Sequence, residues 1–388
     1  MPLRPHQTDA LDAMANHSKG QIIVPTGGGK TMCMIDDAER SGGTVVVVAP
    51  RILLAEQLSS EFLEQIDNVS VMHVHSGETP HYSSTKANDV AEWTLLNRLF
   101  GKKSLIFTTY HSLHRVQESG IPVDTIYFDE AHNSVNRNFF PATKFFGTGG
   151  ADRCFFFTAT PKHSLTPFKA GMNDTEVYGD VLINVPAPKL VDQGYILPPK
   201  VEVYKSRLLR KDEIYSEVES EQMIGAIDRL EVDKVLICAK STKQITGLTS
   251  QSDFCYELNV RGYSWMYITA KTGAIIDGKK VGRDEFFETL NAWGKDDEKK
   301  FVVLHHSILA EGINVKGLEA ALFMRNMDYI TISQTIGRVI RLGNVNKTHG
   351  KVCVPVYNNV GSSTARKVEA VVDTVFNQGQ PAISVVTR

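Results

Sequence analysis

The chain has 388 residues, of which 42% are hydrophobic, with a formal net charge of -2 and 5 cysteines. This length suffices for two domains of ordinary size, and the charge balance excludes a general positive field that would attract nucleic acid or anionic lipid. The scattered cysteines form no CxxC pair, which excludes a disulfide framework and a zinc knuckle and favours a reducing compartment.

The first residues lack a signal segment, and no apolar run approaches the ~18 residues that cross a bilayer. We therefore expect a cytoplasmic protein without a membrane partner.

Short apolar runs in the first half of the chain predict strands. They are continuous and rich in β-branched and aromatic residues, which is typical of a parallel sheet covered by helices on both faces. The segments between them, such as 51–66, carry helical periodicity. The predicted strands are 21–24, 44–49, 69–74, 104–108, 125–129 and 154–158.

The same pattern restarts in the second half, so the sequence predicts two similar α/β domains in tandem. The segment 184–200 is interrupted by several prolines and a glycine, which indicates a boundary there. We predict a first domain at 1–185, a linker at 186–199 and a second domain at 200–388. The second set of predicted strands is 200–205, 234–239, 263–269, 301–306, 320–325 and 351–357.

A glycine-rich stretch, VPTGGGKT, follows the first predicted strand at residues 24–31. Consecutive glycines can turn their N–H groups toward phosphate oxygens, Lys30 can neutralise the β and γ charges, and the Thr31 hydroxyl can hold Mg²⁺. Val24 stands where the strict phosphate-loop pattern has glycine, so the interpretation depends on the strand–turn–helix context. A structural glycine turn is the alternative.

The carboxylates that such a loop needs follow another predicted strand, in TIYFDEAH at residues 125–132. Asp129 is placed to hold the Mg²⁺ shell, and Glu130 is placed to activate the attacking water. Two adjacent acids also occur in helix caps, so the pair indicates catalysis only together with the glycine loop.

With these residues the chain resembles the superfamily 2 helicases, whose motif II has the form DEAH. The resemblance extends from residue 3 to about 345. Its other elements are LRPHQ (3–7), VVAPRILLAEQ (47–57), IFTTYHSL (106–113), FTATP (157–161), LICAKST (236–242), SILAEGIN (307–314) and QTIGRVIR (334–341).

The resemblance implies two RecA-like domains with the ATP site in the cleft between them, and it assigns roles to individual residues. Arg4 would stack on adenine and Gln7 would read its edge. The nucleotide would further be held by Thr26, Gly27, Gly28, Gly29, Lys30, Thr31 and Gly312. Catalysis would use Gln334, Arg338 and Arg341 of the second domain, and coupling would use His132, Thr158 and Thr160. Backbone-type nucleic-acid contacts are expected from Arg51, Thr109, Ser241 and Ser307.

Two departures from the family pattern bear on function. Asn314 replaces a common aspartate, which puts a ribose or coupling contact in doubt. Ile340 replaces the glycine that RNA helicases usually have in motif VI. The resulting GRxxR form is similar to DNA-directed relatives, namely type I and III restriction motors, excision-repair helicases and phage recombination helicases.

The resemblance therefore implies an ATP-dependent DNA helicase or translocase with ATP and Mg²⁺ as cofactors. We expect a monomeric motor core, of the compact phage or accessory type, acting on single-stranded or forked DNA regardless of sequence, in the host cytoplasm if it is viral. Replication or recombination proteins are possible partners.

The alternatives are a branch-migration or remodelling ATPase, a nucleic-acid clamp without turnover, a polypeptide-threading motor and an RNA helicase. DNA-stimulated ATP hydrolysis separates the motor from the clamp.

Four histidines are candidate metal ligands by residue type: His73, His75, His305 and His306. No third ligand stands at a metal spacing from either pair, so we interpret them as strand and loop residues.

Overall fold

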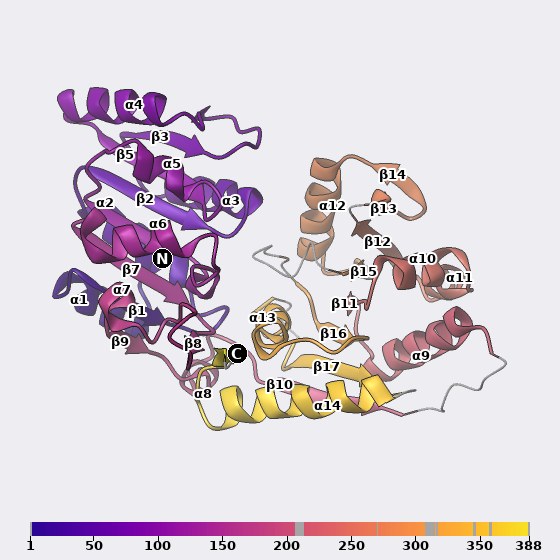
Figure 1. The fold of residues 1–388 in the computed structure, drawn as a ribbon. Helices are drawn as coiled ribbons and strands as arrows, with labels where there is room; N and C mark the ends of the chain where they lie inside the picture. The colour runs from indigo at the N-terminus through magenta and orange to yellow at the C-terminus, as the bar shows by residue number, and fades with distance from the viewer. Residues whose placement is uncertain are drawn as a thin grey trace. The chain divides into compact units, whose positions relative to one another are not determined.

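The computed structural model describes residues 2–205, 213–269, 271–306, 315, 317–343, 347–356 and 359–386. Its contacts divide the chain into unit 1, formed by Met1–Pro186 with Pro381–Arg388, and unit 2, formed by Ala187–Gln380. Each unit is a sheet flanked by helices (Figure 1). None of the helices in the described ranges has an apolar stretch long enough to cross a membrane.

The sheet of unit 1 has the strand order β4-β3-β5-β2-β6-β7-β1-β9, and all neighbouring strands pair in parallel. Every residue of β2 and of β6 is buried, as expected for strands covered on both faces. The strands are β1 Lys19–Ile23, β2 Thr44–Ala49, β3 Val69–Val74, β4 Tyr82–Ser83, β5 Lys103–Thr109, β6 Thr125–Phe128, β7 Arg153–Thr158 and β9 Val181–Asn184.

Apart from α1, which precedes β1, the helices of unit 1 lie in the connections between strands. A 3-10 turn, η1 (Ala131–Asn133), follows β6, and a π-type turn, η2 (Phe146–Gly150), precedes β7. The α-helices are α1 Pro5–Ala15, α2 Lys30–Arg40, α3 Ile52–Leu63, α4 Ala87–Leu99, α5 Leu113–Glu118, α6 Phe140–Phe145 and α7 Thr175–Tyr178.

Unit 2 repeats this design with the strand order β10-β17-β16-β11-β15-β12-β13-β14. Its pairs are parallel except at one edge, where β12, β13 and β14 form an antiparallel meander. The strands are β10 Pro199–Tyr204, β11 Lys234–Cys238, β12 Ser264–Thr269, β13 Gly273–Ile276, β14 Lys279–Val281, β15 Phe301–His305, β16 Ala320–Phe323 and β17 Gly350–Pro355.

The helices of unit 2 are α8 Ala187–Asp192, α9 Tyr215–Leu230, α10 Thr242–Ser250, α11 Phe254–Val260, α12 Arg283–Lys295, α13 Tyr329–Val339 and α14 Asn359–Val372, with the π-type turn η3 at Asp373–Asn377. The predicted α/β fold with mainly parallel sheets is therefore confirmed, and every predicted strand is present to within a few residues.

The division of the chain differs from the predicted one at two places. The expected linker 186–199 contains α8 and the start of β10, and it lies in unit 2 from Ala187 onward. The last strand, β18 (Ser384–Val386), lies in unit 1, because it pairs in parallel with β8 (Lys162–Ser164). The predicted second domain extends to residue 388, whereas unit 2 ends at Gln380.

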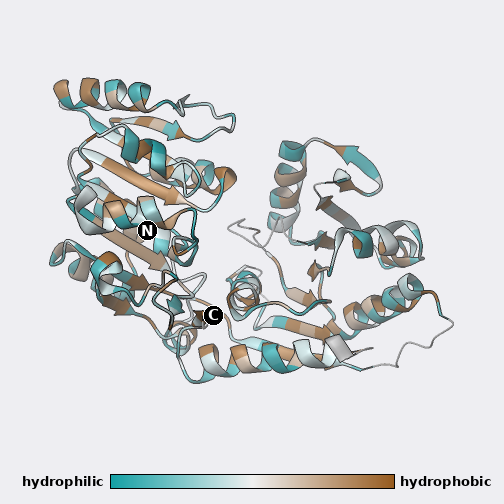
Figure 2. Cartoon of the chain, viewed as in Figure 1, coloured by the Kyte–Doolittle hydropathy of each residue, from teal (hydrophilic) through white to brown (hydrophobic). Residues whose placement is uncertain are grey.

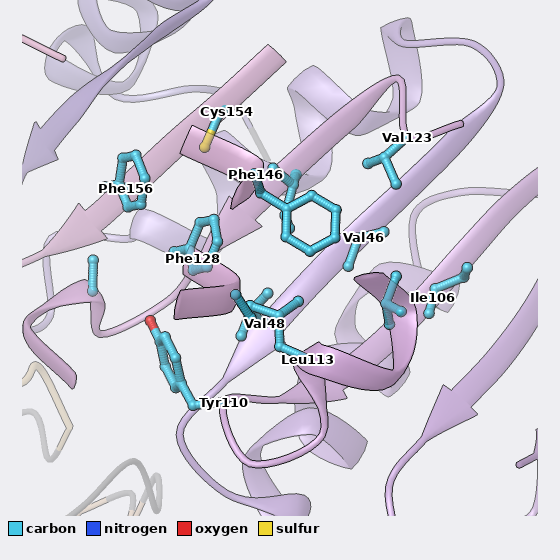
Figure 3. Close-up of a cluster of buried hydrophobic side chains, with 14 of the residues drawn as sticks. Val46, Val48, Ile106, Tyr110, Leu113, Val123, Phe128, Phe146, Cys154 and Phe156 are labelled. Carbon is cyan, nitrogen blue, oxygen red and sulfur yellow. The ribbon is translucent and has the colours of Figure 1, made fainter. Parts of the chain in front are cut away.

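The core of unit 1 includes aromatic side chains of β6 and β7 near the carboxyl ends of these strands. Phe128 and Phe156 stack with a ring-centroid distance of 4.7 Å and are fully buried. Figure 3 shows Phe128 between Phe156 and Tyr110. The Tyr110 hydroxyl donates a 2.8 Å hydrogen bond to the backbone carbonyl of Asp129, so the core fixes the peptide that carries this acid.

The hydropathy colouring agrees with this burial. Figure 2 shows the central strand β2 in brown, whereas α2 and α4 carry teal as well as brown residues. The sheet interior and the helix surfaces are thus separated as the sequence pattern predicts.

A buried histidine pair in unit 1 makes stability depend on pH. His73 Nδ1 lies 2.9 Å from His75 Nε2, and the His73 ring stacks on His81. Burial, reinforced by His75 and His81, lowers the pKa of His73 from 6.5 to about 3, and burial also lowers the pKa of His75. The folded state therefore keeps His73 neutral at a pH where the unfolded chain binds a proton.

We expect stability to fall as pH falls from 6.5 toward 3, by about 1.4 kcal/mol per pH unit for one such group, because the unfolded state binds more protons throughout this window. Urea unfolding of the full chain between pH 4.5 and 7 measures this slope. His73→Gln should make the slope shallower by that amount. An unchanged slope would contradict the assignment.

Candidate active site

The glycine loop joins β1 to α2, which begins at Lys30. Gly27 and Gly29 have φ values of 86° and 85°, a region that residues with a Cβ rarely adopt. A Cβ on Gly29 would also lie 2.5 Å from Gln7 Nε2. The backbone angles therefore favour glycine at this turn, and a side chain at position 29 would also displace Gln7.

Side chains of the N-terminal segment contact three successive backbone carbonyls of the glycine loop. Arg4 Nη1 donates to the Gly27 carbonyl at 3.2 Å, and Gln7 Nε2 donates to the Gly29 carbonyl at 3.0 Å. Between them, buried His6 contacts the Gly28 carbonyl through Nε2 at 2.7 Å, so this nitrogen carries the proton. The loop is thus braced by the chain itself.

His6 is a residue that our sequence analysis did not assign. It lies inside LRPHQ, between Arg4 and Gln7, and the spacing of that element was the only available signal. A contact between residues 22 positions apart is set by tertiary structure, so no local pattern identifies it.

Gln7 is buried and uses both ends of its amide within the chain. Its Oε1 accepts from the Arg4 backbone N–H at 2.8 Å while Nε2 reaches Gly29. An amide nitrogen has two donor hydrogens and its oxygen two lone pairs, so contacts to a base edge remain open to it. Reading of adenine by Arg4 and Gln7 stays a prediction, and the structure adds a link from Gln7 to the phosphate loop.

Gln7→Ala should raise the KM for ATP several-fold and lower kcat less. The change removes the hydrogen bond to Gly29 and would remove the predicted contact to the base, both remote from the bond that breaks. Steady-state kinetics with ATP and GTP measure this, with Asn16→Ala at the exposed end of α1 as the matched control. The prediction is wrong if kcat falls while KM stays constant.

Motif II follows β6 and turns sharply at its second acid. Glu130 has a φ of 46°, a left-handed conformation that costs a non-glycine residue free energy and that is often found at functional sites. Asn133 Nδ2 donates to the Glu130 carbonyl at 2.9 Å and holds this turn. The Glu130 carboxylate consequently lies 3.9 Å from Lys30 Nζ, which brings the two predicted catalytic residues together.

Asp129 is the buried acid of the pair. Burial, followed by the charge of the neighbouring Glu130, raises the pKa of its carboxyl to about 7 against the opposing effect of Lys30. A divalent cation would stabilise the ionised form of such a carboxyl. The Asp129 carboxylate and the Thr31 hydroxyl are hard oxygen donors of the kind that Mg²⁺ prefers, with phosphate and water as its other ligands. These residues therefore fit the ion.

His132 joins motif II to the segment after β7. Its Nδ1 lies 3.1 Å from Thr158 Oγ1, 3.3 Å from Thr160 Oγ1 and 3.6 Å from Glu130 Oε2. The Thr160 backbone N–H also donates to Thr158 Oγ1 at 3.0 Å. The three predicted coupling residues thus form one buried polar cluster that ends on the predicted catalytic base.

The helix that follows the phosphate loop is anchored by an ion pair. Arg153 Nη2 lies 2.7 Å from Asp37 Oδ1, and the Tyr127 hydroxyl donates to the other oxygen of the same carboxylate. These contacts tie α2 to β7 and β6. The helix that begins at Lys30 is thus fixed to the sheet at its C-terminal end.

The predicted catalytic residues of unit 2 lie on and just after α13. Gln334 and Arg338 are four residues apart on this helix, hence on one face, and both are largely buried, while Arg341 follows the helix end. Beside Arg338 lie Cys238 and His305, whose side chains approach to 3.3 Å at the ends of β11 and β15. Burial, with Arg338 as the next cause, lowers the pKa of His305 to about 3, so the imidazole stays neutral there.

The predicted nucleic-acid residues fall in different environments. Arg51 is exposed as the N-cap of α3, and the Ser241 hydroxyl caps α10 by accepting from the Gln244 backbone N–H at 3.2 Å. Thr109 ends β5 and is only 3% exposed, so its side chain offers little to a ligand. Ser307, Gly312 and Asn314 lie outside the described residues.

Two tandem α/β units with mainly parallel sheets, and a braced glycine loop whose Lys30 lies near Glu130, are the features of the RecA-like fold. Residues 1–163 match the family model described as "Type III restriction enzyme, res subunit". This confirms the predicted resemblance to superfamily 2 motors of the restriction type. No curated protein sequence matches the chain.

Two solved structures share the fold. The "ATP-dependent Type ISP restriction-modification enzyme LlaBIII bound to DNA" matches with a TM-score of 0.74 and 17% identity, over 100% of this chain and 31% of that one. A nuclease-deletion mutant of the Type ISP enzyme LlaGI, in complex with a DNA substrate mimic, matches with a TM-score of 0.69 and 20% identity, over 99% and 30%. The chain thus spans about a third of these larger proteins.

Proposed function

We propose that this protein is an ATP-dependent DNA translocase or helicase. The observation that carries the proposal is the convergence of Lys30, Glu130 and the His132 cluster at the carboxyl ends of β6 and β7. These groups supply what phosphoryl transfer needs from the first unit: a cation for the β and γ phosphates and a base for the water. The contacts of His132 also connect the base to the segment after β7.

In the proposed reaction Lys30 would balance phosphate charge, Asp129 and Thr31 would hold Mg²⁺, and Glu130 would orient the attacking water and accept its proton. Mg²⁺ supplies charge neutralisation at the phosphates. Arg338 and Arg341 of unit 2 would meet the charge that develops in the transition state, which requires both units to act on one nucleotide.

DNA is the proposed track because of the GRxxR form of motif VI and because the matching structures are described as bound to DNA or to a DNA substrate mimic. Arg51 and the N-terminus of α10 at Ser241 are the accessible candidates for backbone phosphates. Such contacts read no base, so binding should be independent of sequence and weaken as salt rises.

Triplex displacement from duplex DNA and strand displacement from tailed duplexes test this function in the full chain. ATP should support displacement of the third strand or of the tailed strand, and a non-hydrolysable analogue should support neither. The clamp alternative predicts DNA binding with ATP but no displacement and no turnover. The absence of both displacement reactions would therefore reject a motor.

A further inference from the structure

A short loop after β8 carries the most exposed large apolar side chain in the described part of the chain. Phe168 is 92% exposed, and Leu165 in the same loop is 74% exposed. Single exposed apolar residues are common on protein surfaces. Phe168 differs from them in three ways: the way its loop is held, the position of the loop, and the charges around it.

The base of the loop is fixed by hydrogen bonds to the backbone. The Asn173 side chain accepts from the Ser164 N–H and donates to the Ser164 carbonyl, both at 2.8 Å. The Met172 N–H donates to the Lys162 carbonyl at 2.7 Å. A Cβ on Gly171 would lie 2.3 Å from the Ser164 nitrogen, so only glycine permits this closure. The tip is thus presented from a braced base.

The C-terminal strand adds a second brace. β18 pairs with β8, and the Leu165 N–H donates to the Val386 carbonyl at 3.0 Å, directly where the loop begins. A segment more than 200 residues away in sequence therefore holds the start of the loop. Ordering the tip on a ligand then costs little conformational entropy, because its base is already fixed.

The loop lies on the segment that leaves the coupling cluster. β7 ends at Thr158, the buried Thr160 follows, and β8 starts at Lys162. The strands of unit 1 are parallel, so their carboxyl ends all lie along one side of the sheet. The end of β7 therefore lies on the same side as Asp129 after β6 and Arg51 after β2. Ligands of open parallel sheets bind on this side.

The charges near the tip suit a polyanion. Lys169 follows Phe168 directly and is exposed, while half-buried Lys162 and His163 form the strand that leads into the loop. Burial lowers the pKa of His163, so the two lysines supply the positive charge at neutral pH. An aromatic face beside lysines is the combination that holds single-stranded nucleic acid, with the ring stacking on a base and the cations meeting phosphate.

We propose that Phe168 is a base-stacking site for an unpaired nucleobase of the DNA on which the motor acts. Nothing in the motif pattern assigns this residue, and the inference rests on the proposed function. Because every base has a stacking face, the contact would be independent of sequence. At a junction, it would hold one strand's base out of the duplex and oppose re-pairing.

The test compares affinities of the full chain for a fluorescent oligo-dT and for a blunt duplex. Phe168→Ala should weaken oligo-dT binding by roughly 5- to 100-fold and leave duplex binding unchanged. Phe168→Trp should restore it, because an indole also stacks. Leu165→Ala is the matched control from the same loop and should bind like wild type. DNA-free ATPase activity should be equal in all four proteins, which checks their folding.

Photo-crosslinking locates the contact directly. An oligo-dT containing 5-bromodeoxyuridine should crosslink to the wild-type chain at position 168, as mapped by mass spectrometry, and the crosslink should be lost in Phe168→Ala. Equal losses of affinity in Leu165→Ala and Phe168→Ala would overturn stacking in favour of a general apolar contact. Loss of self-association in Phe168→Ala, with oligo-dT binding unchanged, would overturn it in favour of a protein interface.

The failure of this inference is separable from failure of the proposed function. If wild type binds DNA and hydrolyses ATP in response, but Phe168→Ala does so equally, only the stacking site is wrong. If wild type binds neither DNA form, the proposed function fails first, and the stacking site is overturned with it.

Discussion

Lys30→Ala should abolish ATP hydrolysis and weaken ATP binding, whereas Glu130→Gln should abolish hydrolysis and leave binding intact. In the proposed function Lys30 is the fixed cation that would meet the β and γ phosphates, so its loss should act on both steps. Glutamine keeps the shape of Glu130 and its place 3.9 Å from Lys30, but it cannot accept a proton from water. The contrast between the two variants separates the binding role from the catalytic one.

A fluorescent ATP analogue measures binding, and phosphate release measures turnover, for both variants and wild type. Glu118→Gln on the exposed end of α5 is a matched acid-to-amide control and should behave like wild type. Near wild-type turnover in Glu130→Gln would exclude this residue as the base. Undiminished turnover in Lys30→Ala would remove the phosphate-site assignment itself.

Arg341→Ala should lower kcat by on the order of 10² or more while ATP affinity falls only modestly. The guanidinium would stabilise charge that exists mainly in the transition state, and an arginine in that position is typically worth ~10³ to 10⁵ in rate. The substitution spares the contact of Lys347 Nζ with the Arg341 backbone carbonyl, which the alanine retains, so the local turn should survive.

Single-turnover hydrolysis at saturating ATP measures this effect. Arg261→Ala is the matched control, because Arg261 is an arginine of unit 2 whose ion pairs with Asp228 and Glu257 lie at the surface. It should hydrolyse ATP at the wild-type rate. If Arg341→Ala also keeps that rate, unit 2 contributes no cation to the reaction and has another purpose.

The sequence pattern predicted the regular part of the fold well, because buried parallel strands leave continuous apolar runs such as 44–49. It did not predict β18, whose three residues pair with β8 across more than 200 positions. No local pattern encodes such a contact. The other short strands, β4, β8, β9, β13 and β14, were missed for the related reason that they contain only two to four residues.

The candidate site likewise has features that the sequence predicts and features that depend on tertiary contacts. Residue types and spacing predicted Lys30 and Glu130, and the family resemblance implied a role for His132. The structure brings these three residues together. Sequence could not show that Gln7 and His6 brace the glycine carbonyls, or that Glu130 adopts a left-handed backbone. Those features depend on how α1 and β6 pack, which is decided by tertiary contacts.

The central claim is that ATP hydrolysis by this chain is coupled to DNA. The most direct test is the steady-state ATPase rate of the full chain with no nucleic acid, with single-stranded DNA and with RNA of the same length. We expect strong stimulation by DNA, little by RNA, and loss of stimulation as salt rises. A rate that is the same in all three conditions would contradict it.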